Sequence, residues 1–160
     1  MRTTAEEQLQ KLAIELPAPP KPLGAYVPAV QVGELLFLSG TLPLEGSVPK
    51  FVGRLGAELD VKQGKQAARL AALNALALAR QHLGSLDAVK RVVRLTVSQA
   101  TTPEFRDHAV VADGASELLL SVFGKQRAST RMVSGLASLA AGVPVVVELI
   151  LAVESDTAAD

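Results

Sequence analysis

The run of residues from Val143 to Val153 constrains the fold more than any other stretch of the chain. It reads V-P-V-V-V-E-L-I-L-A-V, which is almost entirely β-branched and aliphatic, and a length of about ten residues favours a strand. A strand that is apolar on both faces is typical of the middle of a sheet. One ionisable residue, Glu148, interrupts the run. Burying a carboxylate is costly, so Glu148 is predicted to need a partner or a proton.

A β-hairpin is predicted near the start of the domain. Two strand-like runs, 26–32 and 35–39, are separated by Gly33-Glu34, and a glycine-containing dipeptide suits the tight turn of a hairpin. The proline- and glycine-rich segment 41–58 that follows predicts a loop, with one short strand around Phe51-Val52.

Three helices are predicted from their start and stop signals. Capping residues, which satisfy the free backbone groups of a first helical turn, precede two of them. Glycine, which ends helices in the left-handed conformation, follows two of them. The predicted helices cover 5–12 (Thr4 with Glu7), 61–83 (Asp60 with Gln63, ended by Gly84) and 104–122 (ended by Gly124).

The strand predicted at 89–97 has one apolar and one polar face. Val89, Val93, Leu95 and Val97 alternate with Lys90, Arg94, Thr96 and Ser98. With a further strand in 127–135, the order is β-β-α-β-α-β-β with hairpins at both ends. This order predicts an α+β sandwich, in which one mixed sheet has two helices on one face. The other face needs a cover, and we expect it to pack against further copies of the chain.

The 160 residues predict one domain with two terminal additions. Residues 1–22 form a short helix and a stiff connector, because the connector carries four prolines (Pro17, Pro19, Pro20 and Pro22). Residues 23–153 form the domain, and 154–160 form a polar tail.

The composition argues against nucleic-acid and membrane partners. Lys and Arg total 16, and Asp and Glu also total 16, whereas binders of polyanions normally have a basic excess. Aromatic residues make up only 3%, which disfavours base stacking. The chain has no cysteine, so disulfides, thiolate catalysis and Cys-ligated metals are excluded. No apolar run approaches the ~20 residues of a membrane span, and we expect a cytoplasmic protein.

Common catalytic and cofactor motifs do not occur in the sequence. There is no G-x-S-x-G, no phosphate-binding glycine pattern and no dinucleotide-binding one. The two histidines, His82 and His108, each fall in a predicted helix without a clustered carboxylate. We therefore predict surface or capping roles for them, no metal site and no cofactor.

Four residues remain as candidates for a binding site: Tyr26, Ser39, Arg131 and Glu148. The planar fork of Arg131 is well suited to a ligand carboxylate. An internal salt bridge, with Glu148 or with Asp113, explains Arg131 equally well from the pattern alone.

Several segments, in this order and spacing, resemble the YjgF/RidA family over about Pro22 to Val153. They are Pro22-Leu-Gly-Ala-Tyr26-Val-Pro-Ala-Val-Gln-Val-Gly33, Leu36-Phe-Leu-Ser39-Gly40, Arg131 six residues ahead of Ala137-Ser-Leu139, and a terminal V-P-V-x-V-E-x-x strand. In addition, Asp113-Gly-Ala-Ser-Glu-Leu-Leu119 is similar to a longer subgroup, once labelled endoribonuclease L-PSP or translation-inhibitor-like.

This resemblance implies a chorismate-mutase-like fold and a homotrimer whose sheets pack into a central barrel, with ligand clefts between protomers. Active family members hydrolyse reactive enamines and imines, such as 2-iminobutanoate and 2-iminopropanoate, to a 2-keto acid and ammonia. By this resemblance the carboxylate-binding arginine is Arg131, the cleft tyrosine and serine are Tyr26 and Ser39, and a helix asparagine is replaced by Asp113.

Two positions depart from the family pattern. Deaminating members carry a water-orienting glutamate where this chain has Val146, and acid–base help of that kind contributes roughly 10²–10⁴-fold to a rate. Glu148 matches a second family glutamate on the same strand face, displaced by about 7 Å. Asp113 brings a negative charge near an anion site, so carboxylate affinity should fall unless Asp113 pairs with Arg131.

Two functions are therefore left open by the sequence. The first is a weak or specialised enamine/imine deaminase, with Arg131 and Glu148 as catalytic residues and Tyr26, Ser39 and Asp113 lining the pocket. The second is a non-catalytic homotrimer that binds a small carboxylate, a keto or imino acid, between protomers. RNA cleavage ranks third, because the neutral, aromatic-poor chain offers little to hold RNA.

Overall fold

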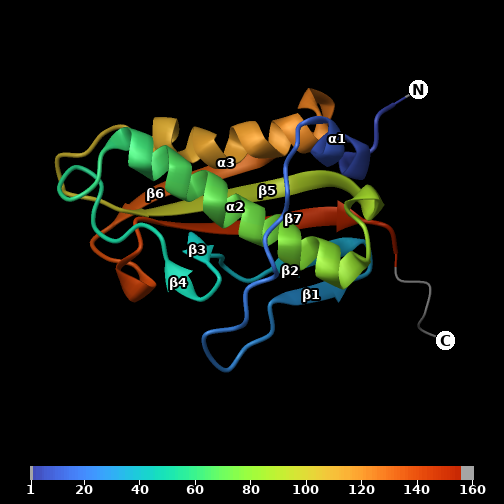
Figure 1. Cartoon of the computed structure of the whole chain (residues 1–160), viewed down its shortest axis with the longest axis horizontal. Coiled ribbons are helices and arrows are strands. Elements are labelled where there is room, and N and C mark those ends of the chain that lie inside the picture. The colour runs from blue at the N-terminus through green and yellow to red at the C-terminus, as the bar shows by residue number, and fades with distance from the viewer. Residues whose placement is uncertain (1, 156–160) are drawn as a thin grey trace.

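The computed structural model describes residues 2–155, which form one mixed sheet with helices on one side (Figure 1). The predicted tail of residues 154–160 lies outside the described residues from position 156 onward. The helices and strands are α1 (Ala5–Lys11), β1 (Ala29–Val32), β2 (Leu35–Leu38), β3 (Leu44–Glu45), β4 (Val48–Pro49), α2 (Val61–Leu83), β5 (Val89–Ala100), α3 (His108–Phe123), β6 (Thr130–Leu136) and β7 (Val145–Val153).

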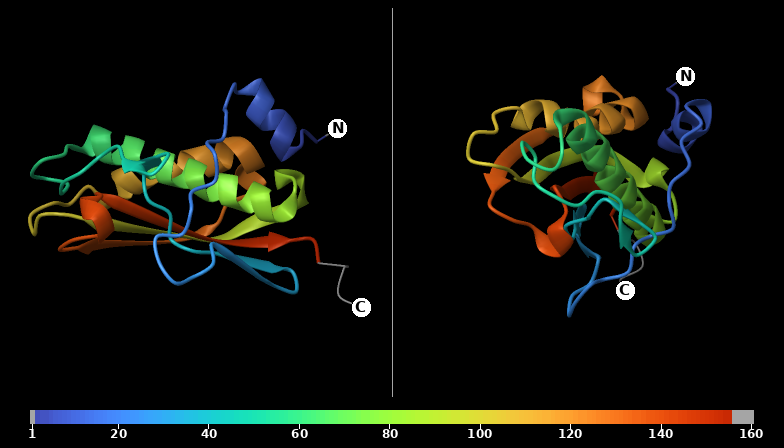
Figure 2. Two further views of the ribbon diagram at one scale, coloured as in Figure 1. Left: turned by 60° about the horizontal axis from the view of Figure 1, so that its bottom comes forward. Right: turned by 60° about the vertical axis from the view of Figure 1, so that its left-hand side comes forward.

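The main sheet has the strand order β1-β2-β7-β5-β6. All neighbours are antiparallel except β5 and β6, which are parallel. Helices α2 and α3 cover one face, as Figure 2 shows, so the predicted α+β sandwich is confirmed. The predicted hairpin of the last two strands is wrong. A parallel pair needs a crossover, which α3 provides between β5 and β6, and β7 then lies between β2 and β5.

The prediction for β7 is correct in its position and wrong in its burial. The strand is central, but its residues alternate between buried and more exposed positions, and Glu148 is exposed. Val146 and Glu148 alternate with the buried residues of β7 and so point away from the helices. Among residues 2–155 no second layer covers that side of the sheet (Figure 2). The charge of Glu148 therefore needs no internal partner.

Strand β5 does not alternate as regularly as its sequence suggests. Register shifts interrupt its pairing with β7 between Val89 and Arg91 and again between Val92 and Arg94. As a result Val92, rather than Val93, is buried in the core. An extra residue in one strand of a ladder reverses the facing of the residues before it, which a simple alternation pattern does not reveal.

The helix predictions are confirmed for α1 and α2 but start too early for α3. Both capping boxes form, and α2 ends at Gly84 in the left-handed conformation. Helix α3 begins at His108 instead of Glu104. The preceding residues form a turn in which the Arg106 guanidinium donates to the carbonyls of Pro103 and Phe105. This turn places the Phe105 side chain in the core.

The segment 41–58 contains a small hairpin. Strands β3 and β4 pair with each other, so the short strand predicted around Phe51-Val52 lies three residues earlier, at Val48–Pro49. Helices α2 and α3 pack so closely that a Cβ added to Gly114 would lie 2.0 Å from the carbonyl oxygen of Lys65. Only glycine fits at that crossing.

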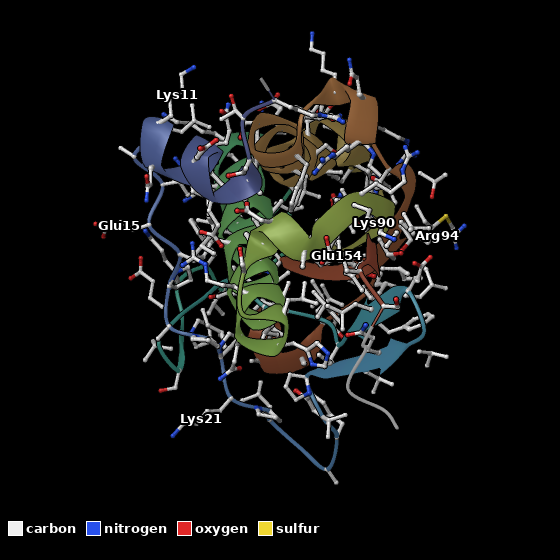
Figure 3. The ribbon with its side chains drawn as sticks, turned by 90° about the vertical axis from the view of Figure 1, so that its right-hand side faces the viewer. Lys11, Glu15, Lys21, Lys90, Arg94 and Glu154 are labelled. Atoms are coloured by element: carbon white, nitrogen blue, oxygen red, sulfur yellow. The ribbon has the colours of Figure 1, made fainter. Side chains whose placement is uncertain are left out.

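The N-terminal segment is tied to the helical layer. Glu6 of α1 accepts two hydrogen bonds from Arg80 of α2, at 3.1 and 2.7 Å, and one from the backbone of Leu86. From α1 the chain runs across α2 toward the β1–β2 hairpin (Figure 1). Its charged residues Glu15 and Lys21 point to solvent, as Figure 3 shows.

The sheet face opposite the helices is open and carries exposed apolar side chains together with the charged Arg94 and Glu148. The pairing registers place the side chains of β1 and β2 beside Ile150 and Ala152 of β7 on this face, and Met132 of β6 beside Thr96 of β5. We call this surface the open face. Its exposed large apolar side chains include Val30, Val32, Leu35, Phe37 and Met132.

Candidate functional site

A cavity of about 300 Å³ lies at the β6 edge of the sheet, against α3, and we call it the Arg131 pocket. Its polar wall consists of Asp113 and Ser116 from α3, and of Arg127, Ser129 and Arg131 from the segment leading into and starting β6. Its apolar wall consists of Val92, Leu119, Leu120 and Ala128.

Arg131 reaches this cavity because of the parallel register of β6. Arg131 pairs with Leu95, which is fully buried beneath the helices, so both side chains are on the helix face. Its Nη1 donates to Asp113 Oδ1 at 2.7 Å and to Ser116 Oγ at 3.0 Å. Asp113 and Ser116 are three residues apart on α3 and share one helix face. The guanidinium is therefore held in place from α3.

This arrangement joins two of the predicted site residues, Arg131 and Asp113. It is the internal salt bridge that the sequence left open as an alternative, formed with Asp113 and not with Glu148. The same pairing meets the condition under which Asp113 is compatible with an anion site. Ser116 and Arg127 were missed by the sequence reasoning. The spacing of Ser116 from Asp113 is a signal that could have identified it, whereas nothing local marks Arg127.

Tyr26 and Ser39 form a separate group, which we call the Tyr26 corner. The Tyr26 hydroxyl accepts a hydrogen bond from the backbone of Leu23 at 3.0 Å, and the Ser39 hydroxyl donates to the carbonyl of Val27 at 2.7 Å. Both line a small crevice of about 20 Å³ beside the proline-rich connector. Val146 adjoins this corner, because its Cγ1 would lie 2.9 Å from a Cβ added to Gly40.

Within one chain the Arg131 pocket and the Tyr26 corner do not meet. Ser39 follows β2 and Arg131 is on β6, and the two intervening strands separate them by about 14 Å, three strand spacings. Glu148 also lies apart from Arg131. It pairs with Thr96 and points to the open face, whereas Arg131 points to the helix face. A single chain therefore keeps the two groups of candidate residues, the Arg131 pocket and the Tyr26 corner, apart.

Neither histidine lines the Arg131 pocket or the Tyr26 corner. His82 is exposed and contacts Gln31 Oε1 at 3.0 Å, and the ring of His108 packs edge-on against Phe105 at 5.1 Å. Within residues 2–155, no group of three or more histidine, aspartate and glutamate side chains is arranged to hold a metal ion. In the same part of the chain, no helix is long and apolar enough to span a membrane.

Comparison with known proteins identifies the group to which this fold belongs. Residues 6–150 match the family model described as "YjgF/chorismate_mutase-like, putative endoribonuclease". Protein TCP17 of Trypanosoma cruzi is 42% identical over 144 residues, which are 89% of this chain and 90% of that protein. The chain therefore belongs to the YjgF/RidA family, as the sequence resemblance predicted.

Two solved structures are similar over nearly the whole chain. A putative endoribonuclease from Shewanella oneidensis matches with a TM-score of 0.90 and 33% identity, covering 94% of this chain and 99% of that one. The protein Atu1372 from Agrobacterium tumefaciens, of unknown function, matches with a TM-score of 0.86 and 34% identity, covering 94% and 92%. The chorismate-mutase-like arrangement is thus shared along the full domain.

Proposed function

We propose that this protein binds a small carboxylate, of the keto or imino acid class, through Arg131. The observation that carries this proposal is the fixed guanidinium in the wall of a cavity of about 300 Å³. Of the three guanidinium nitrogens of Arg131, Nη1 alone donates to other side chains among the described residues. The donors on Nη2 and Nε are therefore left for a ligand. A guanidinium held from one side offers its remaining donors to a carboxylate in a bidentate geometry.

We further propose that the binding unit is a homotrimer. In this trimer the Arg131 pocket of one copy and the Tyr26 corner of another together form one binding site. The open face exposes several large apolar side chains, including Val30, Phe37 and Met132, and large exposed apolar surfaces often mark interaction sites. Packing the open faces of three copies together would bury it. In such an assembly the Tyr26 corner of one copy would approach the Arg131 pocket of the next, giving three clefts.

Hydrolysis of enamines and imines is the second candidate, and one observation favours it. Asp113 places a carboxylate in the wall of the same cavity as Arg131. In this reaction water adds to the C=N bond, and the resulting carbinolamine releases ammonia and leaves a 2-keto acid. A carboxylate can accept the proton from the attacking water. However, Asp113 already binds Arg131, and Val146 offers no acid or base, so binding has the stronger support.

An endoribonuclease activity, which the family description names, has less support in this chain. The net charge is zero, and contacts with RNA backbone depend mainly on cationic side chains. The cavity also suits a small molecule better than a strand of nucleic acid.

Calorimetric titration with 2-oxobutanoate tests the binding proposal. We expect Arg131→Ala to weaken binding by more than about tenfold, because charged hydrogen bonds are lost. The melting temperature should stay within a few degrees. Arg69→Ala, which removes an exposed arginine of α2, is the matched control and should bind normally. A large loss of stability in Arg131→Ala with unchanged binding would identify Arg131 as a purely structural ion pair.

The trimer has its own test. Light scattering should give about three times the chain mass of 16.7 kDa. A monomeric mass would refute the shared cleft.

A further inference from the structure

The Arg131 pocket carries more charge than a simple keto acid can use. Its wall contains two guanidinium groups, from Arg127 and Arg131, and one carboxylate, from Asp113. Asp113 and Arg131 already pair with each other, so a ligand whose single carboxylate binds Arg131 would leave Arg127 without an anionic partner. Polar groups removed from water without a partner cost binding free energy. The three charges of the wall therefore indicate which charged groups the ligand carries.

The first two charges form one recognition unit. Asp113 Oδ1 and Arg131 Nη1 are 2.7 Å apart, and Asp113 Oδ2 has no hydrogen-bond partner among the described residues. An ion pair held at this distance matches a ligand that carries one negative and one positive group on the same carbon atom. The α-carboxylate and α-ammonium of an amino acid are such a pair. The carboxylate would bind Nη2 and Nε of Arg131, and the ammonium would bind Asp113 Oδ2.

The third charge belongs to Arg127, another residue of the cavity wall. Arg127 enters the wall just before β6, and its Nη1 donates to the carbonyl of Val89 at 3.1 Å. This bond fixes the guanidinium and leaves its other donors available. Asp113 is the one acidic side chain of the wall and pairs with Arg131, and no salt bridge to Arg127 occurs among the described residues. A second anionic group of the ligand is needed here.

We infer that the Arg131 pocket binds an amino dicarboxylic acid, of the size of aspartate or glutamate. This inference rests on the proposed function and specifies the ligand of that same pocket. Each ligand charge meets one protein charge: the α-carboxylate meets Arg131, the cationic nitrogen meets Asp113, and the distal carboxylate meets Arg127. A cavity of about 300 Å³ accommodates such a molecule, being at the lower end of the usual range for small-molecule sites.

A matched series of ligands tests each charge without altering the protein. Glutamate contains all three groups, glutamine lacks the distal charge, 2-oxoglutarate lacks the cationic nitrogen, and 2-oxobutanoate has only one carboxylate. We expect glutamate or aspartate to bind at least about tenfold more tightly than each of the other three in calorimetric titrations. That factor is the usual contribution of one charge-assisted hydrogen bond.

Protein variants then assign each charge to its residue. Asp113→Asn should remove the preference for glutamate over 2-oxoglutarate but keep the preference for glutamate over glutamine. Arg127→Gln should do the opposite. Lys125→Ala, an exposed cation outside the cavity wall, should change neither preference. If Arg127→Gln unfolds because it loses the bond to Val89, Arg127→Lys keeps the charge, and the ligand series on the native protein still decides.

The outcomes separate this inference from the proposed function. If 2-oxobutanoate binds through Arg131 as tightly as glutamate does, the site is a carboxylate site and the amino dicarboxylate inference is refuted. If none of the four ligands binds, the proposed function fails as well. If glutamate binds best but Asp113→Asn leaves its preference over 2-oxoglutarate unchanged, the charge assignment is refuted.

Discussion

The substitution Gly114→Ala tests the packing on which the Arg131 pocket depends. Gly114 follows Asp113 on α3 and faces α2 at the crossing of the two helices. A Cβ at this position would lie 2.0 Å from the carbonyl oxygen of Lys65 and 2.9 Å from its carbonyl carbon. Both atoms belong to the α2 backbone, so neither can rotate away. The helices would have to separate by about 1.4 Å to restore an ordinary contact of 3.4 Å.

The expected loss of stability follows from two opposing effects. Overpacking a core costs about 1–3 kcal/mol and occasionally more, and a backbone clash belongs at the upper end of that range. Alanine is favoured over glycine within a helix by about 1 kcal/mol. The net loss should therefore be about 2 kcal/mol. For a chain of this size, this loss lowers the melting temperature by about 4–8 °C.

Gly64→Ala in α2 is the matched control for this experiment. Its added Cβ would lie 2.6 Å from Leu55 Cδ2 and 3.0 Å from Val111 Cγ2, which are ends of side chains that can shift. Urea unfolding of both variants should show a smaller loss for Gly64→Ala. If Gly114→Ala is as stable as the native protein, or no less stable than Gly64→Ala, the close helix crossing is not a constraint on this fold.

Three further substitutions test other parts of the molecule. Phe37→Asp on the open face should convert the proposed trimer to a smaller species in light scattering, because it places a charge in the proposed interface. An unchanged mass would contradict that interface. Glu6→Gln should lower the free energy of unfolding by about 1–2 kcal/mol, since it weakens the bidentate pair with Arg80, whereas the exposed Glu15→Gln should have no effect. Val146→Glu should release ammonia from freshly generated 2-aminoacrylate at least about tenfold faster than the native protein or Val146→Gln, because it adds an acid–base group beside the Tyr26 corner. Equal rates would show that the missing glutamate does not limit the reaction.

Local signals predicted the regular elements well because their causes are local. A cap before α2 and a glycine after it determine its ends, and both are visible within a few residues of sequence. The start of α3 was misplaced because Phe105 is buried by a turn that depends on Arg106 and on the rest of the core. The bulges in β5 were missed for a similar reason, since a register shift is set by the partner strand.

The candidate site was harder to predict than the fold. Arg131 was a candidate from its residue type, and Asp113 was one of two salt-bridge partners considered for it; the family resemblance then gave both residues a place in the site. Which face of the sheet each residue occupies depends on strand order, and the predicted terminal hairpin placed β6 beside β7. With β5 between them, Arg131 and Glu148 point to opposite faces. Arg127 could not be found from sequence, because it joins the pocket only through the way the chain turns after α3.

The position of β7 has a consequence for the order in which this chain can fold during synthesis. Strand β7 is the last element along the described chain, yet it lies between β2 and β5 in the middle of the sheet. Until it leaves the ribosome, the β1–β2 hairpin and the parallel β5–β6 pair have no strand to join them. Each would expose an unpaired edge and a half-formed apolar face to other chains. The nascent chain therefore exposes two unpaired strand edges until β7 has been synthesised, and other chains can pair with these edges during that time.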